Sequence, residues 1–252
     1  MRIRLWAALA VSVLAVSPAW AGKYNWTGFY FGAHGGYGWA DTEYPGTFPY
    51  IAPPATCSNA FGPGLSCGSP RPDLEGGLVG AQIGYNFQYQ EFVFGAELDY
   101  SFTKMQQSVR DGNYLIQDHE ISSLASIRGR LGYAFGDILP YVTGGWAWSD
   151  MSVGQSCPDP SAVVAGHCNA NNNFSPYNLS KDKTETGWVY GAGVETLIAK
   201  YWSIRAEYLR YDFDEEVYVV GTTASGRTVP AKILKHDVDT VRLGVNYNFG
   251  GF

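Results

Sequence analysis

Apolar and polar residues alternate without a break from residue 241 to residue 249. The apolar positions are Leu243, Val245, Tyr247 and Phe249, and Arg242 is one of the polar positions between them. A period of two predicts an extended strand with two unlike faces. In a soluble sheet such a strand would leave an unpaired edge. If it pairs with the first strand of the chain, a barrel closes and the apolar face can contact lipid.

Seven further segments show a similar alternation and are also predicted to be strands. All eight predicted strands together are residues 26–40, 79–89, 92–103, 121–135, 139–149, 184–198, 201–213 and 241–249. Ile121 is placed with Leu131 on the apolar face of the fourth strand. The faces of the fifth strand stay unassigned, because its apolar residues do not keep one phase.

The connections between these strands alternate between long and short. Long polar segments are expected at residues 41–73, 104–118, 151–183 and 214–236, and tight turns near residues 88–91, 136–138 and 200. Outer-membrane barrels combine short periplasmic turns with long external loops in this way. We therefore predict an all-β fold, an eight-stranded antiparallel up-and-down transmembrane β-barrel with long external loops and short periplasmic turns.

The N-terminal residues have the pattern of a secretory signal. Arg2 and Arg4 precede an apolar run at residues 5–16, and Ala19-Trp20-Ala21 fits a cleavage site with small residues. The apolar run is about a dozen residues long, too short against the roughly 20 residues that a spanning helix needs. We predict a signal peptide at residues 1–21 and one outer-membrane barrel at residues 22–252. The chain has 252 residues, of which 46% are apolar, and one barrel of ordinary domain size accounts for this length.

Charge and cysteine content narrow the function further. Removing Arg2 and Arg4 from the 17 basic residues leaves 15 against 23 acidic residues, which argues against nucleic acid as a partner. The four cysteines of this exported chain fall into two local pairs, Cys57 with Cys67 and Cys157 with Cys168. Two short-range disulfides are predicted from this spacing, and other pairings stay open.

Several motifs resemble the alphaproteobacterial outer-membrane immunogenic protein family, the RopB-like porin-family barrels. They are residues 26–32, Gly36-Tyr37-Gly38-Trp39, residues 128–133 and the closing residues 241–247. The resemblance implies an eight-stranded barrel in the bacterial outer membrane, inserted by the barrel-assembly machinery. Members of such families usually stop at the aromatic residue of the last strand. Here Gly250-Gly251-Phe252 follows Phe249, so both phenylalanines are candidates for the terminal assembly signal.

Charged residues concentrate on the predicted strand faces opposite the aromatic residues. They are Glu97, Asp99, Arg128, Arg130, Glu195, Arg205, Glu207 and Arg242. An Arg or Lys facing lipid near the midplane costs about 2 to 4 kcal/mol, so these residues are expected in the lumen. The interior of an eight-stranded barrel is only wide enough for side chains to fill. Four acids and four bases therefore predict a salt-bridged plug rather than an open pore.

Three functional classes remain after these steps. We expect a non-enzymatic structural barrel that supports the envelope and presents surface-exposed loops, with a small-solute porin as the alternative. A soluble ligand-binding barrel of lipocalin type fits poorly, because ionisable groups in a closed apolar core are too costly. Asp118-His119-Glu120 is the nearest candidate for catalysis, but a solvated polar cluster is the simpler interpretation. No catalytic, cofactor or metal site is predicted. The expected partners are outer-membrane lipid and lipopolysaccharide, together with an unidentified ligand of the loops.

The aromatic residues near strand ends suit the two lipid interfaces. Trp26, Trp39, Tyr89, Trp188 and Trp202 are expected to form the aromatic girdles of the barrel.

Overall fold

The computed structural model describes residues 24–43, 73–111, 115–157, 177–214, 216–218, 221–222, 228–229 and 232–250. The predicted signal peptide at residues 1–21 lies outside these ranges, as do Cys57, Cys67, Cys168 and Phe252. No helix in the described part of the chain is long and apolar enough to cross a membrane.

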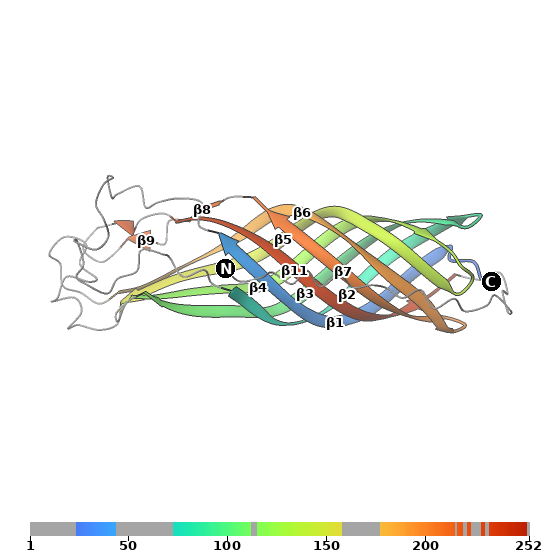
Figure 1. Ribbon diagram of the computed structural model, residues 1–252, viewed down its shortest axis with the longest axis horizontal. Coiled ribbons are helices and arrows are strands. Elements are labelled where there is room, and N and C mark those ends of the chain that lie inside the picture. The colour runs from blue at the N-terminus through green and yellow to red at the C-terminus, as the bar shows by residue number, and fades with distance from the viewer. Residues whose placement is uncertain are drawn as a thin grey trace, which may run out of the picture.

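Eight long strands form a closed ring, and three short strands accompany it (Figure 1). The ring consists of β1 (Gly28–Glu43), β2 (Asp73–Tyr89), β3 (Phe92–Asp111), β4 (Leu115–Tyr133), β5 (Ile138–Cys157), β6 (Tyr177–Ala199), β7 (Trp202–Phe213) and β11 (Lys232–Asn248). The short strands are β8 (Glu216–Tyr218), β9 (Gly221–Thr222) and β10 (Thr228–Val229). Each long strand pairs antiparallel with the next, and β11 pairs with β1 from Tyr30↔Asn248 to Glu43↔Lys235. The predicted eight-stranded up-and-down barrel is confirmed.

Three tight turns lie together at one end of the barrel. They join β2 to β3 after Tyr89, β4 to β5 after Tyr133, and β6 to β7 after Ala199. Gln90 and Gly136 take left-handed backbone conformations in the first two turns, with φ of 55° and 62°. β11 also ends at this end, on the right in Figure 1, and the strand ends that lead into the long connections lie at the other end.

The strands are longer than the sequence pattern predicted. Residues 104–118 were expected to form a loop, but β3 continues to Asp111 and β4 begins at Leu115. In the same way β5 reaches Cys157 and β6 begins at Tyr177. The extended green and yellow strands reach far to the left in Figure 1. The pattern failed there because outward positions become polar where a strand leaves the apolar belt.

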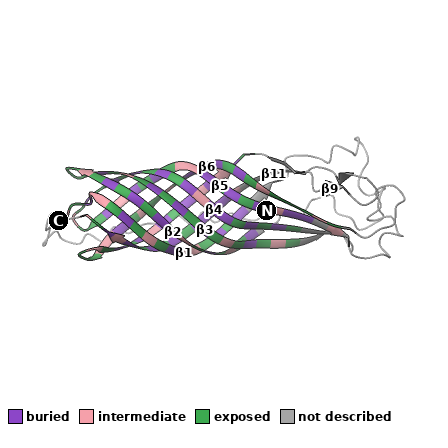
Figure 2. Ribbon diagram, turned by 180° about the vertical axis from the view of Figure 1, so that it is seen from behind, coloured by how far each residue is buried: buried purple, intermediate pink, exposed green. Residues whose placement is uncertain are grey.

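The outer wall is apolar over the height of a membrane. Tyr85, Leu98 and Val245 are 40%, 51% and 42% exposed, whereas Glu97 is 3% exposed and faces inward. Figure 2 shows this alternation of buried and exposed residues along every strand. The ten residue steps from Val79 to Tyr89, at about 3.4 Å each and tilted by about 40°, span roughly 26 Å. This arrangement is the reverse of a lipocalin-type barrel.

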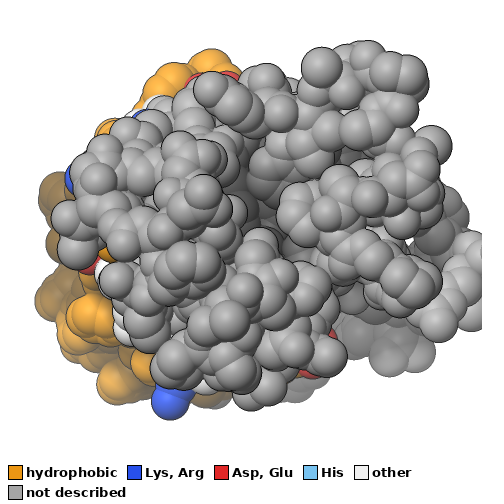
Figure 3. Space-filling view, turned by 90° about the vertical axis from the view of Figure 1, so that its left-hand side faces the viewer, with side chains coloured by type: hydrophobic (Ala, Val, Ile, Leu, Met, Phe, Trp, Pro, Cys, Tyr) orange, Lys and Arg blue, Asp and Glu red, His pale blue; other side chains and the backbone are white. Residues whose placement is uncertain are grey.

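Figure 3 views the molecule from the end opposite the tight turns. Orange hydrophobic side chains of the outer wall remain visible at the left of that view. A few charged side chains appear among them.

The structure also resolves the faces of β5. Leu139, Tyr141 and Ala147 point inward and are buried, whereas Val142 and Trp148 point outward. The alternation along β5 is therefore regular. It was obscured because Tyr141, an aromatic residue, belongs to the inner face.

Candidate functional site

The eight charged residues predicted for the lumen all face the interior. They come from β3 (Glu97, Asp99), β4 (Arg128, Arg130), β6 (Glu195), β7 (Arg205, Glu207) and β11 (Arg242). Every one of them is 6% exposed or less. Inward positions of five strands thus converge on one layer of the lumen.

Arg128 lies at the centre of this layer and contacts three carboxylates. Its Nη2 is 2.5 Å from Glu97 Oε1, its Nη1 is 3.0 Å from Glu207 Oε1, and its Nε is 3.2 Å from Asp99 Oδ2. The planar guanidinium group suits such contacts because its donors point in several fixed directions. One arginine therefore ties β3 to β7 across the interior.

The other three arginines extend the network around Arg128. Arg205 Nη1 is 2.6 Å from Glu97 Oε2, and Arg242 Nη1 is 2.8 Å from Asp99 Oδ1. Arg130 Nη2 is 2.9 Å from Glu195 Oε2. The paired charges offset much of the desolvation cost, because each buried ion has a partner at hydrogen-bond distance.

Three tyrosines form hydrogen bonds with members of the ion pairs. Tyr30 donates its hydroxyl hydrogen to Glu97 Oε2 at 2.6 Å and accepts a hydrogen bond from Arg130 Nη1 at 3.3 Å. Tyr141 donates to Glu207 Oε1 at 3.1 Å, and its ring lies 4.0 Å from the Arg130 guanidinium carbon. Tyr211 accepts a hydrogen bond from Arg242.

Sequence reasoning missed these tyrosines because it assigned aromatic residues to the lipid face. Strand parity was the signal that would have found Tyr30. Phe29 and Phe31 face outward at 61% and 51% exposure, so Tyr30 between them must face the lumen.

Neutral polar residues fill the lumen beside the ion pairs. His34 lies between Gln82 Oε1, 2.5 Å from its Nδ1, and Ser101 Oγ, 2.8 Å from its Nε2. Gln82 donates to Asn246 Oδ1 at 2.6 Å, and Asn246 donates to Glu195 Oε1 at 2.8 Å. Hydrogen bonds therefore continue from β1 through β2 and β11 to β6.

Two glycines leave the space that the large lumen side chains occupy. A Cβ atom at Gly95 would lie 2.7 Å from Arg130 Cγ, and one at Gly193 would lie 2.6 Å from the Tyr141 hydroxyl oxygen. A side chain at either position would displace a member of the network.

Apolar clusters lie at both ends of the charged layer. Toward the long connections the buried cluster contains Ala40, Leu74, Met105, Ile121, Leu124, Ala147, Met151, Val153, Val189, Leu209, Tyr211, Phe213 and Val238. Toward the short turns it contains Trp26, Val93, Ala134 and Leu139, with Tyr24 and Leu197 packed against them. We call the cluster toward the long connections the outer cluster and the cluster toward the short turns the inner cluster. Both lie inside the barrel. The eight charged residues thus lie between two apolar clusters.

The inner cluster corrects the expectation for Trp26. This residue is 4% exposed and its Nε1 donates to the Gly136 carbonyl oxygen at 3.2 Å. It therefore covers the short-turn end of the lumen instead of joining an aromatic girdle. Trp188 and Trp202, at 60% and 46% exposure, do face outward.

The outer cluster corrects the expectation for Ile121. A β-bulge shifts the pairing of β4 with β5 between Ile121 and Ser123, so both Ser123 and Leu124 are buried. The shift moves Ile121 from the outer to the inner face, where it is 0% exposed. If inward and outward positions are counted back from Arg128 in strict alternation, Ile121 falls on the outer face, because such a count does not detect the bulge.

The structure separates the three residues of the remaining catalytic candidate. His119 is buried and faces inward, whereas Asp118 and Glu120 on either side of it are exposed. The alternation of β4 therefore separates these three side chains, and His119 is not the solvated residue expected. No group of three or more His, Cys, Asp or Glu residues that could hold a metal ion occurs within the described ranges. Cys157 ends β5, and its predicted partner Cys168 lies outside those ranges, so the disulfides stay predictions.

Comparison with known proteins shows a family and relatives that this chain resembles. The profile of the outer membrane protein β-barrel domain matches residues 6–249. The chain is similar to the 25 kDa outer-membrane immunogenic protein of Brucella abortus, with 27% identity over 91% of this chain and 82% of the relative. It is also similar to the 31 kDa outer-membrane immunogenic protein of Brucella melitensis, with 27% identity over 96% of this chain and 93% of the relative.

Among solved structures, the chain is similar to that of Ail, the attachment invasion locus protein of Yersinia pestis. It is 12% identical, with a TM-score of 0.42, and the match covers 88% of this chain and 99% of that one.

Proposed function

Because this chain belongs to the outer membrane protein β-barrel domain family and resides in the bacterial outer membrane, we propose that it is a structural barrel with a closed lumen. In this role the barrel is non-enzymatic. It supports the envelope and presents its long connections at the cell surface as antigen. The names of the two Brucella relatives are in keeping with the surface role.

The observation that carries the proposal is the packing of the lumen. Arg128 and Arg242 are 2% and 0% exposed, although they lie in the most polar layer of the interior. A water-filled channel would expose such side chains along its wall. The interior of an eight-stranded barrel has room for side chains alone, and here they are large and paired.

The two apolar clusters support the same conclusion. Leu139 in the inner cluster and Met105 in the outer cluster are 0% exposed. An ion crossing the barrel would have to pass the buried apolar side chains of both clusters, which cannot replace its hydration shell. A closed lumen therefore accounts for the clusters and the charged layer together.

The proposed partners follow from the outer wall. Lipid chains and lipopolysaccharide surround the apolar belt, and the barrel-assembly machinery inserts the chain. Phe249 is 59% exposed on the outer face, and its backbone nitrogen donates to the Phe29 carbonyl oxygen at 2.8 Å. We propose Phe249 as the terminal assembly signal, since it continues the outward series of β11.

Conductance across a planar lipid bilayer tests the closed lumen. The refolded barrel should show no stable ohmic conductance, and Glu97→Gln should not create one. Arg210→Gln, which alters a partly exposed ion pair with Asp237 on the outer face, is the control for a surface charge. A stable ohmic conductance that changes with Glu97→Gln but not with Arg210→Gln would favour the small-solute porin instead.

A further inference from the structure

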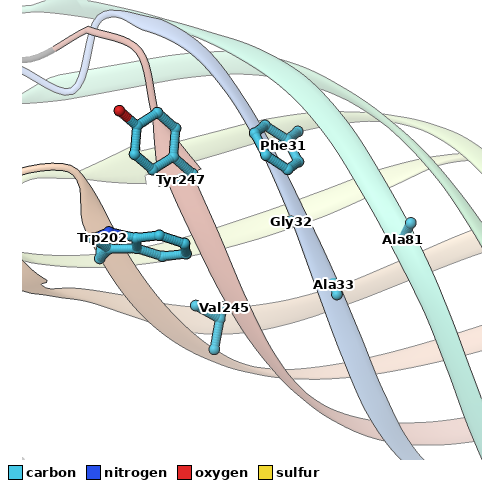
Figure 4. A pocket seen from close by; sticks show the side chains of 7 residues that line it. All are labelled: Phe31, Gly32, Ala33, Ala81, Trp202, Val245 and Tyr247. Carbon is cyan, nitrogen blue, oxygen red and sulfur yellow. The ribbon is translucent and has the colours of Figure 1, made fainter.

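A groove on the outer wall crosses the seam where β11 closes the barrel against β1. Phe31, Gly32, Ala33, Ala81, Trp202, Val245 and Tyr247 line it, and its volume is about 370 Å³ (Figure 4). This volume lies within the range of roughly 300 to 1,000 Å³ that is usual for small-molecule sites. The lining residues come from β1, β2, β7 and β11, so the groove depends on the closed ring.

Small residues form the floor of the groove, and aromatic residues form its walls. Ala33 pairs with Ala81 across β1 and β2, and both are exposed on the lipid-facing side. Phe31 and Trp202, from β1 and β7, are 51% and 46% exposed. In Figure 4 Phe31 lies above Gly32 on β1, and the rings of Tyr247 and Trp202 lie to the left of these residues. The lining of the groove is therefore apolar.

A positive charge lies near one end of the groove. Lys200 occupies the tight turn before Trp202, and its Nζ is 5.1 Å from the centroid of the Tyr201 ring. The Tyr201 ring stacks on Tyr247, a wall of the groove, at a centroid distance of 5.7 Å. Short turns of such barrels face the periplasm, so this lysine lies at the level of the periplasmic lipid headgroups.

We propose that this groove binds one acyl chain of a phospholipid in the periplasmic leaflet, with the phosphate beside the ammonium group of Lys200. The apolar groove matches the chain, and the adjacent cation matches the negatively charged headgroup. A second copy of the barrel fits less well, because stable protein interfaces use about 20 to 30 residues a side. The groove is on the outer wall, so the inference is independent of whether the lumen conducts.

Lipid titration of the folded full-length barrel, followed by native mass spectrometry, tests the site. With palmitoyl-oleoyl phosphatidylglycerol as the probe, one lipid should bind more tightly than the rest. Ala81→Phe fills the floor and displaces about two methylene groups of the chain, so affinity for that lipid should fall about tenfold. Lys200→Gln should lower it about threefold, as expected for an exposed ion pair.

Matched variants separate this site from general lipid adhesion. Ala192→Phe places the same ring on the outer face of β6, away from the groove, and should leave affinity unchanged. Lys104→Gln removes a charge at the opposite end of the barrel and should also have no effect. Binding of the matching diacylglycerol, which has no phosphate, should fall with Ala81→Phe but not with Lys200→Gln.

Two results would overturn the proposal. In the first, the unaltered barrel and Ala81→Phe bind lipid equally well. In the second, Ala81→Phe abolishes a dimer of the barrel but does not weaken lipid binding. The heat-dependent gel shift of folded barrels shows whether Ala81→Phe has folded. If it has not, Ala33→Leu on the paired strand provides the same test.

Discussion

The middle of the barrel and the strand extensions beyond it place polar residues on opposite faces of the same strands. In the middle of β3, Glu97 faces inward and Leu98 faces outward. A few residues later Met105 faces inward with 0% exposure, and Lys104 faces outward. The parity of the strand does not change between these positions. Its surroundings change from lipid to water, and the two faces exchange polarity.

This comparison shows that the solvent outside the wall determines what fills the inside. Where lipid covers the wall, the apolar side chains point outward into the lipid, and the charged side chains point into the lumen. Where the wall is wet, as at Asp150 on β5, apolar Met151 and Val153 face the interior. The outer cluster therefore buries apolar side chains inside the barrel, whereas the charged layer next to it has its apolar side chains on the outside.

The largest effect is expected from breaking the charged layer. Arg128→Ala leaves three buried carboxylates short of a partner and should lower the free energy of unfolding by about 3 to 5 kcal/mol. Urea titration in detergent, read by the heat-dependent gel shift, measures the change. An unchanged midpoint would contradict a buried network.

The outer cluster should respond to loss of volume. Met105→Ala removes a fully buried side chain and should cost about 2 to 5 kcal/mol of unfolding free energy. Lys104→Ala on the outer face of the same strand should stay within about 0.5 kcal/mol. The same urea titration applies, and equal effects of the two variants would argue against an apolar core beyond the membrane.

The destabilisation caused by an added charge on the outer wall should depend on whether that position along the strand faces lipid or water. Leu98→Arg near the middle of β3 should cost about 2 to 4 kcal/mol in a bilayer, whereas Gln106→Arg, outward and exposed in the extension, should cost close to nothing. Unfolding in lipid vesicles measures both. Similar costs at the two heights would place the lipid boundary elsewhere.

A smaller effect is expected from a single lumen hydroxyl. Tyr30→Phe removes hydrogen bonds to Glu97 and Arg130 and should cost about 1.5 to 3 kcal/mol, as for hydrogen bonds to charged groups. Tyr100→Phe on the outer face is the control and should change stability little. Equal stability of Tyr30→Phe and the unaltered barrel would mean that Tyr30 does not link the ion pairs.

The barrel and its charged residues were predictable because lipid permits very few arrangements. An ion such as Arg242 on a regular alternating strand has only the lumen available, so sequence parity alone placed it. The tyrosines were missed because a ring with a hydroxyl group suits both faces, as Tyr141 inside and Tyr208 outside show. Ile121 was misplaced because a bulge changes phase without a signature in the pattern of residue types.

The strand extensions were missed for a different reason. The prediction treated polar outward residues as the start of a loop, although strands continue through the change of solvent. Trp26 was placed in the lipid interface because its position near a strand end suits a girdle, but its packing against Leu139 depends on contacts distant in sequence.

Labelling of single cysteines with a water-soluble thiol reagent tests the closed lumen most directly. Ser101 and Ser108 both lie on β3, where Ser101 is 0% exposed in the lumen and Ser108 is exposed on the extension. In bilayers, with the four native cysteines replaced by serine, Ser108→Cys should react rapidly and Ser101→Cys should stay unlabelled. Labelling of Ser101→Cys at the rate of Ser108→Cys would show a water-filled lumen and contradict the account.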